Sequence, residues 1–266
     1  MRCLVVRRPR ELVARIALVL VVLCALVSCS NSDDGNEDYG FSVDDVRVNG
    51  PGTVGLSMSG QPVKGLIVYF HGSDQTARVI RDDEKHRNLF DPMLRAGYAV
   101  VAADADGNAF GNPRSLGSYR RLVAAAREKY GAGPMFFVAE SMGALAALTL
   151  INEDADGQVR AMVAVSPLMG LPPPAREVNY ITGPWGGTVP ASADPMTWPL
   201  SAFANRAFRL YLPRDDTVVP AGGTGKDFAA RFGSVAAVEI VECQGGHVAS
   251  ACYQGDDVEK WITARG

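Results

Sequence analysis

A serine at an apparent strand-to-helix turn is the residue of this chain best suited to chemistry. Ser141 follows an apolar run at 135–138, typical of a buried strand, and precedes an Ala- and Leu-rich run at 144–151, typical of a helix. Such a turn exposes the serine hydroxyl above the sheet, and the residues two before and two after it must be small because the two backbones nearly touch. Those residues are Ala139 and Gly143. The pattern predicts that Ser141 is a nucleophile.

A serine hydroxyl is a poor nucleophile at neutral pH, so it needs a base, and the base needs a carboxylate to orient it. The chain has three histidines, His71, His86 and His247. His247 lies in a glycine-rich loop after the mostly apolar run 235–241, from which its ring can swing toward the serine. We therefore interpret His247 as the base. His86 lies in a charged run and is interpreted as a solvated helix residue.

The turn around Ser141 resembles the nucleophile elbow of the α/β-hydrolase superfamily, with Ala139 in place of the usual first glycine of G-x-S-x-G. The resemblance covers about residues 41–264. It implies an acid between the serine and the histidine, after another strand. Asp216 fits the usual D-x-x-V-P arrangement, and Asp215 is the adjacent competitor. The order Ser141, Asp216, His247 is the one that the superfamily uses.

The resemblance also implies an oxyanion hole. The apolar run 65–70 is followed by His71-Gly-Ser73, which corresponds to the His-Gly loop after the third strand of these enzymes. The backbone amides of Ser73 and Met142 would then hold the developing oxyanion. In this interpretation His71 has a structural role, in which its ring hydrogen-bonds the loop.

Each of these residues has a simpler interpretation when taken alone. Ser141 would be a helix N-cap, Asp216 a turn residue and His247 a loop histidine. Their conjunction favours a serine hydrolase that acts on a small-molecule or lipid-like carboxylic ester, without metal or organic cofactor. A serine peptidase or an acyltransferase of the same fold would use the same triad. A non-catalytic binding module is the remaining alternative, although such relatives normally lose a triad member.

Strand-like and helix-like runs alternate along the chain, which predicts an α/β fold with a mostly parallel sheet covered by helices on both faces. The loop at 104–118 is expected to line the pocket, with Phe110 as an apolar wall. A small irregular cap is expected at about 167–207, in which Trp185 or Trp198 either lines the pocket or anchors the loop. We expect strands at 41–48, 55–58, 66–70, 98–103, 135–138, 161–165, 209–212 and 237–241, and helices at 76–88, 118–130, 142–152, 224–232 and 256–264.

The beginning of the chain indicates export. Residues 1–28 combine five arginines with an apolar stretch of twelve residues at 16–27, which is typical of a signal peptide. The segment 26–29 resembles a bacterial lipobox, in which Cys29 becomes lipidated; an ordinary signal peptide is the alternative. Residues 29–40 are polar and acidic and are predicted to be a flexible tether to the catalytic domain, 41–266. We expect an enzyme that is lipid-anchored at the outer face of the membrane.

The charge balance argues against nucleic acid as a partner. The chain has 26 Lys and Arg and 29 Asp and Glu, and residues 1–28 hold five of the basic and one of the acidic residues, so the remainder carries a formal charge of −7. We expect a monomer. In an oxidising compartment Cys243 and Cys252 are predicted to form a disulfide around His247, and two buried free thiols are the alternative.

Overall fold

The strands of the computed structural model, which describes residues 42–131 and 133–266, form one sheet. Its order is β1-β2-β4-β3-β5-β6-β7-β8. The first two pairings, β1 with β2 and β2 with β4, are antiparallel and all the others are parallel. The predicted mostly parallel sheet is therefore confirmed. The strands are β1 (Val43–Val46), β2 (Thr53–Met58), β3 (Gly65–Phe70), β4 (Tyr98–Ala103), β5 (Met135–Glu140), β6 (Val159–Val165), β7 (Ala207–Pro213) and β8 (Ala237–Cys243).

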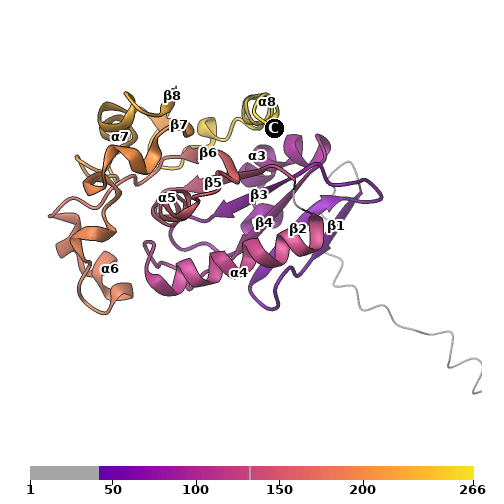
Figure 1. Cartoon of the computed structure of the whole chain (residues 1–266), viewed down its shortest axis with the longest axis horizontal. Coiled ribbons are helices and arrows are strands. Elements are labelled where there is room, and N and C mark those ends of the chain that lie inside the picture. The colour runs from indigo at the N-terminus through magenta and orange to yellow at the C-terminus, as the bar shows by residue number, and fades with distance from the viewer. Residues whose placement is uncertain (1–41, 132) are drawn as a thin grey trace, which may run out of the picture. The chain divides into compact units, whose positions relative to one another are not determined.

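Helices cover both faces of the sheet, because its central strands are apolar on both sides. In β3, Val68 and Phe70 point to one face, where α4, α5 and α7 pack. Ile67 and Tyr69 point to the other, where α3 and α8 pack. Figure 1 shows α4 on one side of the sheet and α3 and α8 on the other. The helices are α2 (Val79–Asp82), α3 (Glu84–Arg95), α4 (Pro113–Tyr130), α5 (Gly143–Glu153), α6 (Asn179–Thr182), α7 (Gly225–Phe232) and α8 (Gly255–Thr263).

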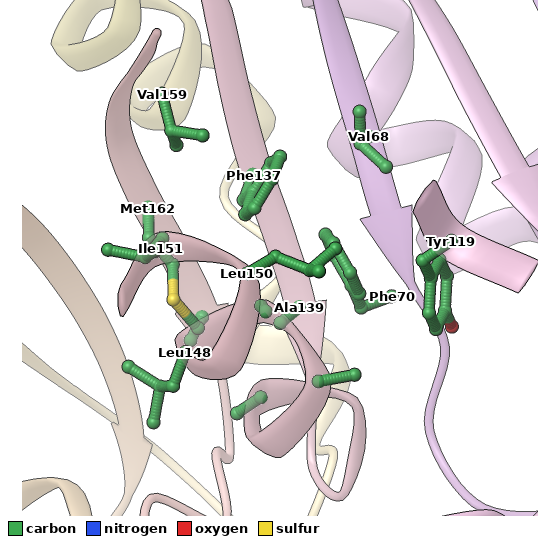
Figure 2. Packing of buried hydrophobic residues seen from close by; sticks show 14 of the residues in the cluster. Val68, Phe70, Tyr119, Phe137, Ala139, Leu148, Leu150, Ile151, Val159 and Met162 are labelled. Atoms are coloured by element: carbon green, nitrogen blue, oxygen red, sulfur yellow. The ribbon is translucent and has the colours of Figure 1, made fainter. Parts of the chain in front are cut away.

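The core beneath α5 supports the end of β5. Figure 2 shows Phe137 and Ala139 of β5 between Phe70 on one side and Leu148 and neighbouring residues of α5 on the other. Ala139 is completely buried in this cluster. A small side chain at this position lets the helix lie close to the strand.

Two helices, α3 and α4, differ from the sequence prediction by more than one residue at an end. α4 begins at Pro113 rather than at 118, because the Asn112 side chain caps it by accepting a hydrogen bond from the Ser115 amide at 2.9 Å and proline suits the first turn. α3 runs to Arg95, seven residues beyond the expected end at 88, and starts only after the cap at Asp83. Because α4 begins at Pro113, residues 113–118 of the predicted loop are helical.

The segment between β6 and β7 is irregular, as predicted for the cap. Apart from α6 it contains only single turns of 3-10 helix: η1 (Ala175–Glu177), η2 (Gly183–Trp185), η3 (Ala191–Ala193), η4 (Pro195–Thr197) and η5 (Leu200–Phe203). Asp194 organises this segment from a buried position, where its Oδ1 accepts hydrogen bonds from the amides of Leu171 and Met196 at 2.9 and 3.0 Å. A further 3-10 turn, η6 (Ser250–Cys252), precedes α8.

The predicted signal peptide at 1–28, the lipidation site Cys29 and the tether at 29–40 lie outside the described residues. Within the part of the chain that the structure describes, no helix is both long and apolar enough to cross a membrane.

Candidate active site

Ser141 lies at the turn between β5 and α5, in a backbone conformation that few residues adopt. Its φ of +47° is in the left-handed region, and the turn is held by a hydrogen bond from the Ser141 amide to Val165 O at 3.1 Å. Gly143 fits where no other residue would, because a Cβ there would lie 2.2 Å from Phe70 O. The predicted need for a small residue two positions after Ser141 therefore has a direct steric basis.

The three residues predicted to act together meet at one end of the sheet. His247 Nε2 lies 2.9 Å from Ser141 Oγ, and His247 Nδ1 lies 2.8 Å from Asp216 Oδ2. Both imidazole nitrogens are thus within hydrogen-bond distance of the atoms that a serine triad requires. The chain of contacts can move a proton from the hydroxyl to the ring while the carboxylate orients the ring.

Asp216, rather than Asp215, contacts the histidine. Its second oxygen, Oδ1, accepts hydrogen bonds from the amides of Val218 and Val219 at 2.9 and 3.3 Å, which fixes the carboxylate. Asp215 is exposed, and its amide donates to Gly245 O at 3.1 Å. Val219, the valine of the D-x-x-V-P arrangement, thus supplies one of the two amides that hold the Asp216 carboxylate in place.

A disulfide and a further hydrogen bond also tie the loop that carries His247 to its surroundings. A disulfide joins Cys243, at the end of β8, to Cys252, with the two Cα atoms 5.3 Å apart. The Val248 amide donates a hydrogen bond to Ser166 Oγ at 2.9 Å. Val248 has a φ of +51°, an unfavourable conformation for a β-branched residue, so these ties hold the loop in a strained shape next to the base.

The predicted oxyanion loop follows β3 and is braced by His71. The ring of His71 is buried, with Nδ1 2.7 Å from Gly72 O and Nε2 2.8 Å from Asp104 O, so the ring ties this loop to the one after β4. The backbone amides of Ser73 and Met142 donate to no acceptor within residues 42–131 and 133–266. Both amides remain able to bind an external oxygen.

His86 corrects the sequence interpretation. It is 1 % exposed rather than solvated, because α3 begins at Glu84 and turns His86 toward the sheet together with Leu89 and Phe90. Its Nε2 lies 2.9 Å from Glu140 Oε2, and its Nδ1 contacts Asp83. The charged neighbours of His86 suggested an exposed residue, but His86 itself faces the core.

Glu140, the residue before Ser141, is the group next to the site that the sequence interpretation missed. It is 2 % exposed, and the signal that could have revealed it is an ionisable residue at the end of an apolar strand. Burial alone would raise the pKa of Glu140, but hydrogen bonds from His86 and Tyr253, with the charge of His86, outweigh burial and hold this pKa below its ordinary value. Burial and the Glu140 charge raise the pKa of Tyr253, which therefore remains a donor.

The two cap tryptophans occupy different places. Trp198 packs on Phe203 of the main core, with ring centroids 5.8 Å apart, and donates to Ser192 O at 2.8 Å. It anchors the loop. Trp185 instead packs in a separate apolar cluster that contains Met142 and Phe110, and its Nε1 lies 3.3 Å from Phe110 O. Trp185 and Phe110 thus belong to the apolar cluster on the Met142 side of the elbow.

Among the described residues, no group of three or more His, Cys, Asp and Glu side chains is arranged to hold a metal ion.

Several solved structures share this fold. They include an esterase from Pyrococcus furiosus (20 % identity, TM-score 0.58, 85 % of this chain and 91 % of that one). An S-formylglutathione hydrolase from Agrobacterium tumefaciens is 14 % identical, with a TM-score of 0.64 over 84 % of this chain and 94 % of that one. Carboxyl esterase 2 from Tuber melanosporum is 16 % identical, with a TM-score of 0.60 over 90 % of each chain. At these identities the likeness establishes the fold.

No match was found among curated protein sequences. The sequence does match a family model described as serine aminopeptidase, S33, over residues 61–207, which is more than half of the chain. The matched region includes Ser73 and Ser141, whereas Asp216 and His247 follow it. With the mostly parallel sheet and the likeness to solved esterases, this match shows that the chain belongs to the serine aminopeptidase S33 family and has the α/β-hydrolase fold.

Proposed function

We propose that this hydrolase is a serine hydrolase that cleaves carboxylic esters through an acyl-enzyme. The observation that carries the proposal is the continuous chain of contacts from Ser141 Oγ through His247 to Asp216, at the strained turn after β5. The esterases among the solved structures of the same fold support an ester as substrate.

The reaction follows from the positions of these groups. His247 Nε2 accepts the Ser141 proton as Oγ attacks the acyl carbon, and the carbonyl oxygen takes up the negative charge. The amides of Ser73 and Met142 stabilise that charge. As the tetrahedral intermediate collapses, the imidazolium returns its proton to the departing alkoxide. His247 then deprotonates a water molecule, which attacks the acyl-enzyme and releases the acid and the serine hydroxyl.

A serine peptidase is the second candidate, because the family description names an aminopeptidase. The same triad and oxyanion amides would serve an amide bond. The two candidates differ in the leaving group, which is an alcohol in one case and an amine in the other. They are separated by comparing ester and amide substrates that share one acyl group.

The test is a panel of chromogenic esters of increasing acyl length beside the matching anilides. We expect ester turnover to exceed anilide turnover, and Ser141→Ala to abolish both turnover and labelling by a fluorophosphonate probe. Ser234→Ala, which alters an exposed serine away from the triad, is the matched control and should label like the wild type. Undiminished labelling of Ser141→Ala would remove the nucleophile assignment. Adding an alcohol acceptor and analysing the products identifies any acyl transfer.

The predicted anchor completes the proposal: the enzyme is exported and held at the outer face of a membrane by a lipid on Cys29. The disulfide between Cys243 and Cys252 supports an oxidising compartment. Cys29→Ala, or globomycin treatment, should abolish lipidation, whereas Cys24→Ala should not. A mature N-terminus beyond residue 29 without lipid, found by mass spectrometry, would contradict the anchor.

A further inference from the structure

Glu140 is a buried ionisable group beside the nucleophile that takes no part in the proposed reaction. Its backbone is covalently joined to Ser141 at the end of β5, and its carboxylate points away from the triad into a cluster of polar side chains. A buried carboxylate is costly unless all its acceptor positions are used. The partners of its two oxygens therefore indicate what the residue does.

One oxygen is held by the core. Glu140 Oε2 accepts hydrogen bonds from Tyr253 Oη at 2.5 Å and from Tyr69 Oη at 3.1 Å, and it lies 2.9 Å from His86 Nε2. These donors come from β3, from α3 and from the segment before α8. This half of the carboxylate is fixed relative to the sheet and needs no further support.

The other oxygen faces the predicted oxyanion loop. Gln75 Nε2 donates to Glu140 Oε1 at 2.5 Å, and Gln75 Oε1 accepts a hydrogen bond from the Gly72 amide at 3.0 Å. A Cβ at Gly72 would lie 2.4 Å from Glu140 Oε1, so a glycine is needed for the loop to lie against the carboxylate. Gly72 immediately precedes Ser73. One carboxylate thus connects the elbow to the loop that carries the second oxyanion amide.

We propose that Glu140 and Gln75 are positioning residues that hold the Ser73 amide at a fixed place relative to the Met142 amide. The inference rests on the proposed function. The Met142 amide moves with the elbow, whereas the Ser73 amide belongs to a loop on a neighbouring strand. The Glu140–Gln75–Gly72 link joins the two through side chains anchored in the core.

The loop needs such a link because its next residue is strained. Asp74 has a φ of +61° and is exposed, and its amide and side chain are held from the solvent side by Asn108 at 2.6 Å. The Gln75 link holds the loop from the buried side. Without it, the Gly72 amide loses its acceptor and the loop loses its attachment to the elbow.

The effect is on turnover rather than on substrate binding. Losing a complete oxyanion donor costs about 10²–10³ in kcat, and a displaced donor costs part of that. Gln75→Met keeps the length of the side chain and removes its hydrogen bonds with Glu140, the Gly72 amide and Tyr69 Oη. We expect kcat to fall about 10- to 100-fold, with KM changed by less than about threefold, because the amides bind the charge that develops only in the transition state.

Tyr253→Phe is the matched control. It removes one hydrogen bond from the same carboxylate, on the oxygen that does not face the loop. A role limited to stabilising the fold would make both variants lose activity in proportion to their loss of stability. The proposed role predicts a lower melting temperature in Tyr253→Phe with kcat within about threefold of wild type, because its loop contacts remain.

Two further measurements report on the loop itself. The exchange rate of the Gly72 amide proton, followed by NMR, should rise by about tenfold or more in Gln75→Met and stay unchanged in Tyr253→Phe. The ratio of kcat/KM for an ester and its thiono analogue should fall in Gln75→Met only, because sulfur accepts hydrogen bonds weakly and gains less from well-placed amides.

Gln75→Met with kcat within threefold of wild type, or with unchanged Gly72 exchange, would overturn the inference. So would equal losses of kcat in Gln75→Met and Tyr253→Phe. A wild-type protein that neither hydrolyses esters nor reacts with the fluorophosphonate would refute the proposed function instead. The exchange comparison would still decide whether the link holds the loop.

Discussion

Two imidazole–carboxylate pairs lie close to Ser141, and they differ in burial and in the partners of the ring. In the pair of His247 and Asp216 the side chains are 16 % and 14 % exposed. In the pair of His86 and Glu140 they are 1 % and 3 % exposed. His247 has the Ser141 hydroxyl at one nitrogen, whereas His86 has a carboxylate at each nitrogen.

The difference shows what separates a proton-transfer group from a structural one in the same site. An imidazole transfers a proton only when one nitrogen can change its partner during the reaction. In the proposed reaction His247 meets that condition, because Ser141 gives up its proton to the ring. His86 does not, because its ring is buried and leaving the buried Glu140 carboxylate without this contact would be costly.

The largest effect is expected at Asp216, the proposed acid. Asp216→Asn should lower kcat by about 10³–10⁴, because the amide no longer selects the tautomer of His247 that can accept the serine proton. Asp215→Asn is the matched control. Its kcat should stay within about threefold of wild type, because the Asp215 side chain is exposed. Steady-state kinetics on one ester suffices. If Asp215→Asn is the inactive variant, the assignment of the acid is off by one residue.

Alanine substitutions of the two histidines should lower the free energy of unfolding by different amounts. His86→Ala leaves the Glu140 carboxylate buried without one of its polar partners and should lower the free energy of unfolding by about 3–5 kcal/mol. His247→Ala should lower it by less than about 1 kcal/mol, because its pair is partly exposed, while abolishing turnover. Urea denaturation of both variants measures the difference. Equal losses of stability would show that burial does not distinguish the two pairs.

Removing the disulfide should affect both stability and turnover. Replacing Cys243 and Cys252 with serine should lower the free energy of unfolding by about 2–3 kcal/mol, because the closed loop is short. It should lower kcat roughly a hundredfold, because the loop carries His247 and a base displaced by about an ångström loses that much. Thermal melting and kinetics on the oxidised wild type and the variant test this. An unchanged kcat in the variant, or two free thiols in the exported protein, would contradict it.

The smallest effect concerns pH. The pKa of Glu140 in the folded protein lies below its ordinary value of 4.5. The stability that it contributes is therefore fully present above pH 4.5 and is lost as the pH falls through the folded-state pKa. Glu140→Gln should flatten this acid limb of the stability curve, measured by urea denaturation at several pH values. Glu128→Gln, at an exposed carboxylate of α4, should follow the wild type.

Much of the site was predictable because its signals are local. The apolar strand, the small residues around Ser141 and the glycine-rich loop before His247 each reflect constraints between residues close in sequence. The predicted contacts of Ser141, His247 and Asp216 then follow from placing strand ends at one edge of a parallel sheet.

The boundaries of α3 and α4 were less predictable, because they depend on caps. Asn112 and Asp83 begin these helices with single side-chain hydrogen bonds, which a hydrophobic pattern does not register. The shift in α3 also reversed the interpretation of His86, since a residue's face on a helix depends on where that helix begins.

The sequence by itself determined the fold class, and it predicted the turn at Ser141 and the set of Ser141, Asp216 and His247, because local steric and hydrophobic constraints repeat along the chain. Only the tertiary structure decided that Asp216 rather than Asp215 contacts His247, and that Glu140 meets His86, Tyr253 and Gln75. The last three lie 54, 113 and 65 residues from Glu140 along the chain. A buried charge is tolerated only where such distant donors converge, so its role becomes visible once the chain has folded.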